Sequence, residues 1–302
     1  MKPELPRWCG NPYLLLTLTA LFWSGNMVLG RGIRADVPPI ALAFWRWLIA
    51  FTLVLPLALP HWQTHAPGIR RHLPALLLLA ALGIAGYNTL AYLALQTTSA
   101  TNAVLLNAFI PIATITLAWV FFKKALSSLE VLGVAISLLG ALTIIARGEL
   151  ASLTALVPNS GDLWMLAAVL VWACYTLGLQ FRPPDMPPMF LLAVLIAFGL
   201  LMLAPFYLWE ILAGRSLHLH AGSLLGLAYV GIFPSFIGYI FYNRGVAEVG
   251  ASRASLFIHL MPVFGTLLAA LFLDERPSLY HLLGISLIFT GIALATRKPT
   301  RP

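Results

Sequence analysis

The fold is decided by residues 100–140, ATNAVLLNAFIPIATITLAWVFFKKALSSLEVLGVAISLLG, because residues 251–291, ASRASLFIHLMPVFGTLLAALFLDERPSLYHLLGISLIFTG, repeat them without a gap. The two stretches share eleven identities in 41 positions. Leu and Ala match often by chance, so the most informative pairs are residue types with a backbone reason to recur: Pro111/Pro262, Gly133/Gly284 and Gly140/Gly291. The chain is therefore predicted to be an internal duplication, which determines its architecture.

The composition places the chain in a lipid bilayer. Hydrophobic residues make up 60% of the sequence and charged residues 9%, and the mean hydropathy is +0.91. A membrane-spanning helix needs about 20 predominantly apolar residues. Ten runs of about that length occur, at 13–30, 40–59, 74–95, 99–122, 128–146, 162–181, 189–210, 222–242, 251–273 and 279–296. The predicted fold class is an all-α integral membrane protein with ten transmembrane helices.

The duplication extends to the first helix of each half. At an offset of 149 residues, Trp23 coincides with Trp172, and Pro38-Pro39 with Pro187-Pro188. Each half then holds five helices, and an odd number makes the second half enter the membrane from the opposite side. We expect a first repeat at 1–147, a linker at 148–160 and a second repeat at 161–302, in the inverted topology of many secondary transporters.

The net charge of +8 reflects topology. Basic residues on the side of the N-terminus are Lys2, Arg7, Arg70, Arg71, Lys123, Lys124, Arg182, Arg244, Arg253, Arg297, Lys298 and Arg301. Those on the opposite side are Arg31, Arg34, Arg147, Arg215 and Arg276. Twelve against five is the positive-inside bias, so both termini are predicted to be cytoplasmic and no nucleic-acid partner is implied.

The sequence gives no support for an enzyme. An intramembrane enzyme needs its acids or histidines gathered at one depth. The ten carboxylates instead fall in tails, in loops or at span ends. Cys9 lies in the N-terminal tail and Cys174 within a helix, so neither a disulfide nor a metal cluster is expected. No cofactor is predicted, and no cleavable signal is evident at the N-terminus.

The candidate substrate cavity consists of aromatic, amide and imidazole side chains predicted within the spans. They are Trp23, Asn26, Tyr87, Asn102, Trp172, Tyr175, Tyr239, Asn243 and His259. Polar groups at this depth must face protein or water. Such an uncharged, aromatic lining suits a small, net-neutral, amphipathic solute.

Several of these predictions have a structural alternative. Arg46 is the one basic residue well inside a span, and it is either a substrate anchor or a charge locked by backbone carbonyls or a loop acid. His259 either carries a proton or is hydrogen-bonded between helices. Tyr92 and Tyr242, near span ends, are expected in an interfacial aromatic belt.

Two kinds of repeated residue concern helix geometry. Pro111 and Pro262 each remove a helical hydrogen bond, so both helices should kink, and the kinks are candidate gating elements. Gly133, Gly140 and their counterparts lie seven residues apart and share a helix face, which allows close helix packing. We expect these last two helices to form a scaffold or a dimer contact, with the protein a monomer or a homodimer.

The chain resembles the drug/metabolite transporter superfamily, specifically its ten-helix EamA-type members. The resemblance covers nearly the whole chain and rests on four features: Trp23-Ser24-Gly25-Asn26, Arg46, residues 92–111, and Asp274-Glu275-Arg276-Pro277 followed by Gly284 and Gly291. Within the family the chain looks most like YddG-type amino-acid exporters. One departure is Lys123-Lys124, where the family commonly has an acid.

The resemblance implies export of aromatic and other neutral amino acids across a bacterial inner membrane. It also implies a central cavity lined by helices 1, 3, 4, 6, 8 and 9, the same set that the polar residues indicate. Another small neutral metabolite or drug is the nearer alternative, and a membrane interaction protein without transport is the farther one. Because no buried carboxylate is expected, facilitated diffusion or exchange is favoured over proton antiport.

Overall fold

The structure is a computed structural model that describes residues 11–124, 127–149, 159–272 and 278–296. Cys9, the motif at 274–277 and most of the expected linker at 148–160 lie outside the described residues. Within the described ranges all the regular structure is helical, and ten helices are long and apolar enough to cross a membrane. The prediction of an all-α protein with ten spans is confirmed.

Each span is one helix or a short series of helices. Those of the first half are α1 (Pro12–Gly32), α2 (Pro39–Ala58), η2 (Leu59–His61), α3 (Trp62–Arg71), α4 (Leu73–Leu79), η3 (Ala80–Gly86), α5 (Tyr87–Thr97), α6 (Ala100–Asn107), α7 (Ile110–Phe122) and α8 (Ser128–Ile145). Those of the second half are α10 (Ser160–Gly178), η4 (Leu179–Phe181), α11 (Pro188–Leu212), α12 (Ala221–Val230), η5 (Gly231–Ile237), α13 (Gly238–Val249), α14 (Ala251–Leu256), η6 (Phe257–His259), α15 (Leu260–Phe272) and α16 (Leu279–Thr296).

Local sequence signals explain where several spans begin. Asn11 caps α1, because its side-chain oxygen accepts a hydrogen bond from the backbone N–H of Tyr13 at 3.0 Å. Ser127 and Glu130 form a capping box at the start of α8. Asn159 and Asp162 form another at the start of α10.

The start of α2 takes its cap from another helix. Pro38 and Pro39 precede its first free N–H groups and have no side-chain donor or acceptor of their own. The carboxylate of Glu210, near the end of α11, accepts hydrogen bonds from the backbone N–H of Ile40 at 3.2 Å and of Ala41 at 2.7 Å. A negative charge at a helix N-terminus is favourable, so this fully buried acid joins the two halves.

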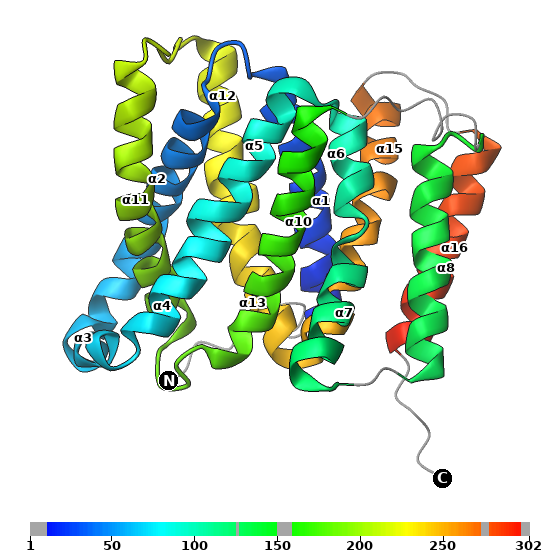
Figure 1. Cartoon of the computed structure of the whole chain (residues 1–302), viewed down its shortest axis with the longest axis horizontal. Coiled ribbons are helices and arrows are strands. Elements are labelled where there is room, and N and C mark those ends of the chain that lie inside the picture. The colour runs from blue at the N-terminus through cyan, green and yellow to red at the C-terminus, as the bar shows by residue number, and fades with distance from the viewer. Residues whose placement is uncertain (1–10, 125–126, 150–158, 273–277, 297–302) are drawn as a thin grey trace.

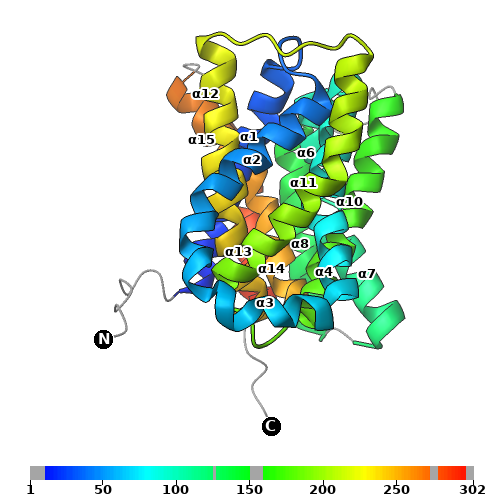
Figure 2. The same ribbon diagram turned by 90° about the vertical axis from the view of Figure 1, so that its left-hand side faces the viewer.

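Helices of the first half pack against helices of the second half in corresponding pairs. The antiparallel pair α2 and α11 forms one flank of the bundle, and α8 and α16 form the other (Figure 1). Between the flanks, α1 packs against α13 and α15, and α10 correspondingly packs against α5 and α7. Since α1 starts at the end of the bundle where α10 finishes, the two halves run in opposite senses (Figures 1 and 2).

The flank formed by α8 and α16 is closed by glycines. A Cβ atom on Gly133 would lie 2.5 Å from the backbone oxygen of Gly291, and one on Gly140 would lie 2.6 Å from that of Gly284. Contacts this close require hydrogen as the side chain. The repeated glycines therefore pack the two halves of a single chain against each other.

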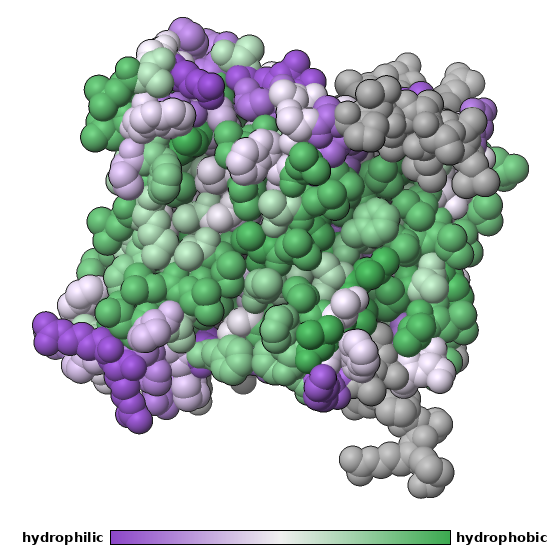
Figure 3. All heavy atoms as spheres, viewed as in Figure 1, coloured by the Kyte–Doolittle hydropathy of each residue, from purple (hydrophilic) through white to green (hydrophobic). Residues whose placement is uncertain are grey.

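The outer surface suits a bilayer. Leu201 on α11, Leu225 on α12 and Leu163 on α10 are each about 70% exposed. Figure 3 shows hydrophobic residues across the middle of one face and hydrophilic residues gathered toward its two ends. An apolar band between polar rims is the surface expected of a multi-pass membrane protein.

Candidate functional site

Aromatic side chains from both halves pack together in the centre of the bundle. Each is less than 9% exposed, and they are Trp23, Trp47, Tyr87, Trp172, Tyr175, Tyr239 and Tyr242. Trp23 and Trp172, which are counterparts in the duplication, meet edge to face with ring centroids 4.9 Å apart. Tyr87 lies 4.7 Å from Trp172 by the same measure, and Tyr239 lies 4.7 Å from Trp47. We call these seven residues the ring cluster; its packed side chains fill the boundary between the halves.

Arg46 lies beside the ring cluster and is 1% exposed. Its guanidinium donates hydrogen bonds to three uncharged groups of the first half: the Oδ1 atoms of Asn26 at 3.4 Å and Asn88 at 2.6 Å, and the hydroxyl of Tyr92 at 2.5 Å. It donates a fourth bond to Ser235 Oγ of the second half, at 2.6 Å. Neither backbone carbonyls nor an acid are among these partners, in contrast to the structural alternative expected from the sequence.

Two π-helical segments contribute backbone acceptors to the same region. η3 and η5 are offset by 151 residues, so they are counterparts in the duplication. The hydroxyl of Tyr239 donates to the carbonyl of Gly83 in η3, at 2.5 Å. The indole N–H of Trp23 donates to the carbonyl of Pro234 in η5, at 3.1 Å. A π-helix displaces carbonyls from the regular helical ladder, and in both segments a donor from the opposite half bonds to one.

The fourth and ninth spans are each interrupted one turn before their proline. In the fourth, Ala108 and Phe109 separate α6 from α7, whose second residue is Pro111. In the ninth, η6 separates α14 from α15, in which Pro262 follows. Proline cannot donate to the preceding turn, which accounts for a break at these places.

His259 joins these two interruptions. Its Nε2 lies 2.9 Å from the carbonyl oxygen of Ala108, its counterpart 151 residues earlier, and its Nδ1 lies 2.5 Å from Ser137 Oγ on α8. Because a carbonyl only accepts, Nε2 carries the proton, and Nδ1 accepts from the Ser137 hydroxyl in the neutral ring. The ring is fully buried, and both nitrogens have partners.

Asn243 connects the ring cluster to a cavity at one end of the bundle. Its Oδ1 accepts a hydrogen bond from the hydroxyl of Tyr175 at 2.9 Å. Asn243 also lines a cavity of about 550 Å³, together with Arg182 and the ion pair of Arg244 with Glu248. This cavity lies at the end of the bundle where α3 is located, which we call the α3 end (Figure 1).

The opposite end of the bundle has a separate cavity of about 390 Å³. It is bordered by Pro262 and Gly265 of α15 and by Ala100 and Thr101 of α6. Asn102 is half-buried near this end, and its backbone N–H is capped by Ser99 Oγ at 3.0 Å. The ring cluster therefore lies between cavities at the two ends, and Asn102 lies away from it.

Comparison with known proteins now identifies the class of the chain. The model of the EamA-like transporter family matches residues 11–146 and again residues 159–297. The chain belongs to this family.

The chain is also similar to uncharacterized transporters along nearly their whole length. The EamA-like chain is 25% identical to the uncharacterized transporter YyaM of Bacillus subtilis over 287 residues, which cover 95% of this chain and 93% of the relative. It is 26% identical to an uncharacterized transporter of Archaeoglobus fulgidus over 291 residues, 95% and 97% of the two chains. A solved crystal structure of another protein aligns with a TM-score of 0.72 at 20% identity, covering 94% and 96%, which shows that the fold is shared.

The structure brings together most of the side chains expected in the cavity of this EamA-like transporter. Trp23, Tyr87, Trp172, Tyr175 and Tyr239 are members of the ring cluster. Asn26 bonds Arg46, and Asn243 bonds Tyr175. His259 lies between the interrupted helices, and Asn102 is toward one end.

Sequence reasoning gave Tyr92 and Tyr242 the wrong environment. They were expected in an interfacial belt, but each is 1% exposed, and Tyr242 packs against Trp23 with centroids 5.0 Å apart. Asn88 was not selected for the site, yet its Nδ2 donates to Tyr239 at 3.1 Å, 151 residues away. The offset between these counterparts was the available signal.

The described part of the chain offers no place for a metal ion of ordinary coordination. Among its residues, no three His, Cys, Asp or Glu side chains lie close enough to hold one. The groups in and beside the ring cluster are aromatic rings, hydroxyls, amides and one guanidinium. Groups of these kinds can bind a solute by stacking and hydrogen bonding.

Proposed function

We propose that this EamA-like transporter exports small, net-neutral solutes, above all amino acids with aromatic or other apolar side chains, by alternating access. The observation that supports this most directly is the position of the ring cluster between cavities at the two ends of the bundle. A cluster built from both halves opens toward one end or the other when the halves tilt against each other. The two repeats, 1–147 and 161–302, are proposed as the moving bodies.

The lining favours a neutral amphipathic substrate. Aromatic faces at the centre can stack on an apolar or aromatic side chain. The Nδ2 of Asn107 is buried without a hydrogen-bond partner, while its Oδ1 accepts from Tyr87 at 3.2 Å. An amide donor beside the rings is available to an acceptor atom of a bound solute.

The charges at this depth argue against a phosphorylated or cationic substrate. A phosphorylated metabolite calls for several Lys or Arg side chains. In the described spans Arg46 alone lies beside the ring cluster, and its bonds go to uncharged groups. Among the described carboxylates, Glu210 is occupied at the start of α2, and Glu130 pairs with Arg253 at 3.2 Å near the α3 end. We propose exchange or facilitated diffusion, with cytoplasmic termini in a bacterial inner membrane.

Counterflow tests this proposal. Purified protein in liposomes is preloaded with unlabelled phenylalanine, threonine or a sugar phosphate, and entry of labelled phenylalanine is followed without an ion gradient. We expect accumulation with either amino acid inside and none with the sugar phosphate. Accumulation with the sugar phosphate alone would overturn the assignment, and none with any of the three would exclude amino-acid exchange without an ion.

A matched pair of tryptophans on α10 localises the substrate. Trp172 is in the ring cluster, whereas Trp164, two turns earlier, is 47% exposed on the lipid-facing surface. Trp172→Ala, like Trp23→Ala, should abolish counterflow in protein that stays monodisperse. Trp164→Ala should retain it, and full activity in Trp172→Ala would place the substrate elsewhere.

A further inference from the structure

An apolar groove lies on the outer face of the bundle, where α2 and α11 run side by side and α3 crosses below them (Figure 2). It has a volume of about 370 Å³, within the range of small-molecule sites. All of its lining side chains are apolar: Phe51, Leu55, Ala58, Leu59, Trp62, Ile69, Phe190, Ala193, Val194, Ala197 and Phe198. None of its lining residues belongs to the ring cluster, so we treat it as separate from the proposed substrate path.

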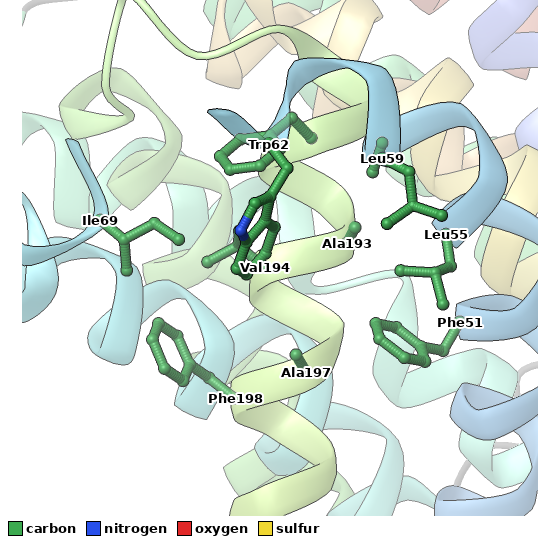
Figure 4. Close-up of a pocket in the computed structure, with 11 residues that line it drawn as sticks. Phe51, Leu55, Leu59, Trp62, Ile69, Ala193, Val194, Ala197 and Phe198 are labelled. Carbon is green, nitrogen blue, oxygen red and sulfur yellow. The ribbon is translucent and has the colours of Figure 1, made fainter. Parts of the chain in front are cut away.

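The groove runs lengthwise along the helices. Phe51 and Leu55 on α2 and Leu59, the first residue of η2, follow one another at single-turn spacing, and Ala193 and Ala197 do so along α11. In Figure 4, Ala193 and Ala197 of α11 lie between Phe51, Leu55 and Leu59 on one side and Ile69 on the other. Trp62 lies near one end. An apolar groove that runs lengthwise along membrane-spanning helices is complementary in shape and polarity to a lipid acyl chain.

One end of the groove is formed by a basic interfacial segment. α3 contributes Trp62 and Ile69 to the groove, and Arg70 and Arg71 follow at once, both exposed. The sequence has no acid between Asp36 and Glu130. Figure 3 shows a hydrophilic corner over α3, below the hydrophobic flank.

Aromatic contacts hold α3 at the end of the groove. The rings of Trp62 and His65 lie 5.9 Å and 5.8 Å from that of Phe190, the third residue of α11. Tryptophan and histidine combine an apolar ring with a polar edge, which suits the depth of lipid headgroups. The arrangement joins an acyl-chain channel to a cationic surface at headgroup level.

The second half lacks this arrangement. Residues 213–220, which connect α11 to α12 at the corresponding place, form no helix. One of their two histidines, His220, is paired with Asp36 at 3.1 Å, so an acid is present there. The basic helix and its groove are thus specific to one end of the molecule, the end proposed to face the cytoplasm.

We propose that this groove binds one acyl chain of an anionic phospholipid, and that Arg70 and Arg71 bind its headgroup. The apolar walls alone would accept the chain of any lipid. The positive charge of α3, which has no ion-pair partner among the described residues, selects a negative headgroup, because basic residues at the membrane surface attract anionic lipids. The bound lipid would fix α3 against α2 and α11.

Native mass spectrometry of the full chain in detergent tests the proposal. Phosphatidylglycerol and phosphatidylcholine with identical chains are titrated separately, and glycerol 3-phosphate serves as the headgroup alone. We expect the wild-type chain to bind phosphatidylglycerol at least tenfold more tightly than phosphatidylcholine, and not to bind glycerol 3-phosphate. Equal affinity for the two lipids, or binding of glycerol 3-phosphate as tight as that of the lipid, would overturn the proposal.

Two variants distinguish binding of the lipid headgroup from binding of the acyl chain. Arg70→Gln/Arg71→Gln should weaken phosphatidylglycerol binding roughly 30-fold and leave phosphatidylcholine unchanged. Ala197→Phe, which fills the groove, should weaken both lipids.

The matched controls are Arg34→Gln/Arg215→Gln, two exposed cations at the opposite end, and Ala293→Phe on the exposed face of α16. Both should bind lipid as the wild type does. Unchanged phosphatidylglycerol binding in the Arg70/Arg71 variant, or equal losses in these controls, would show that the groove is not the site.

Discussion

Arg46 donates hydrogen bonds to four uncharged side chains from both halves, so it links the two repeats. Three of its hydrogen bonds go to the first half and one goes to Ser235 of the second. Its guanidinium also lies 5.4 Å from the ring of Trp47, which adds a cation–π contact. A buried charge without an acid is costly, so these bonds must compensate for lost hydration.

Replacing Arg46 tests how much its hydrogen bonds contribute to stability and to transport. Arg46→Met leaves Asn88 Oδ1 without a hydrogen-bond partner and removes one bond each from Tyr92 and Ser235, which keep their bonds to Asn26 and Val230. We expect a loss of roughly 2–4 kcal/mol in stability and no transport. Arg46→Lys keeps the charge but cannot reach several partners at once, so it should be intermediate in stability. Thermal unfolding in detergent measures the first effect and counterflow the second. A more stable Arg46→Met would show that burying the charge costs more than its bonds return.

The neutral His259 leads to a prediction about pH. Since Nε2 donates to Ala108 and Nδ1 accepts from Ser137, the ring has no free nitrogen for a transported proton. His259→Gln and Ser137→Ala should each lower stability by about 1–2 kcal/mol through lost hydrogen bonds. Both should leave the pH profile of counterflow unchanged. A profile that flattens in His259→Gln would establish proton coupling through this ring.

At the scale of elements, the two glycine helices α8 and α16 give the sharpest stability prediction. Gly291→Ala would put a Cβ atom 2.5 Å from the oxygen of Gly133, and Gly140→Ala one 2.6 Å from that of Gly284. Each should destabilise the protein by roughly 1–3 kcal/mol through overpacking. Thermal unfolding should separate them from the control Gly32→Ala, whose added atom meets nothing within 4 Å. Equal melting temperatures in all three would contradict close α8–α16 packing.

The elements show which parts of the fold are readable from sequence. The spans followed from apolar length, and the interruptions before Pro111 and Pro262 from the chemistry of proline. The π-helical segments η3 and η5 were not predicted: Pro234 within η5 was the local signal available, and η3 contains no proline. The bond from Tyr239 to Gly83 spans 156 residues, which no periodic pattern reveals.

The candidate site also contains residues that the sequence predicts and residues that it does not. The aromatic residues Trp23 and Trp172 were predictable because the duplication aligns them and the membrane requires polar edges to face protein. The partners of Arg46 were not predictable, since they come from three other spans. Tyr92 and Tyr242 were misplaced because position along a span says how deep a ring lies but not whether it faces lipid or protein.

At the scale of the whole molecule, the proposed alternating access requires that access to one end of the bundle exclude access to the other. Ala247 borders the cavity at the α3 end, and Gly265 borders that at the opposite end. Rings packed 4.7–5.2 Å apart leave no continuous path between them. In the proposed mechanism, opening parts the cluster on one side while the other side stays closed.

Cysteine accessibility tests this coupling in a background of Cys9→Ser and Cys174→Ala. Ala247→Cys and Gly265→Cys are each labelled in liposomes by a membrane-impermeant thiol reagent, with and without excess phenylalanine. We expect the substrate to shift the two labelling rates several-fold in opposite directions, because one population of conformers grows at the expense of the other. Ser216→Cys, on the exposed connection after α11, should not respond. Labelling rates that rise or fall together would show that both ends open or close at the same time. Such a result would contradict alternating access even if counterflow were observed.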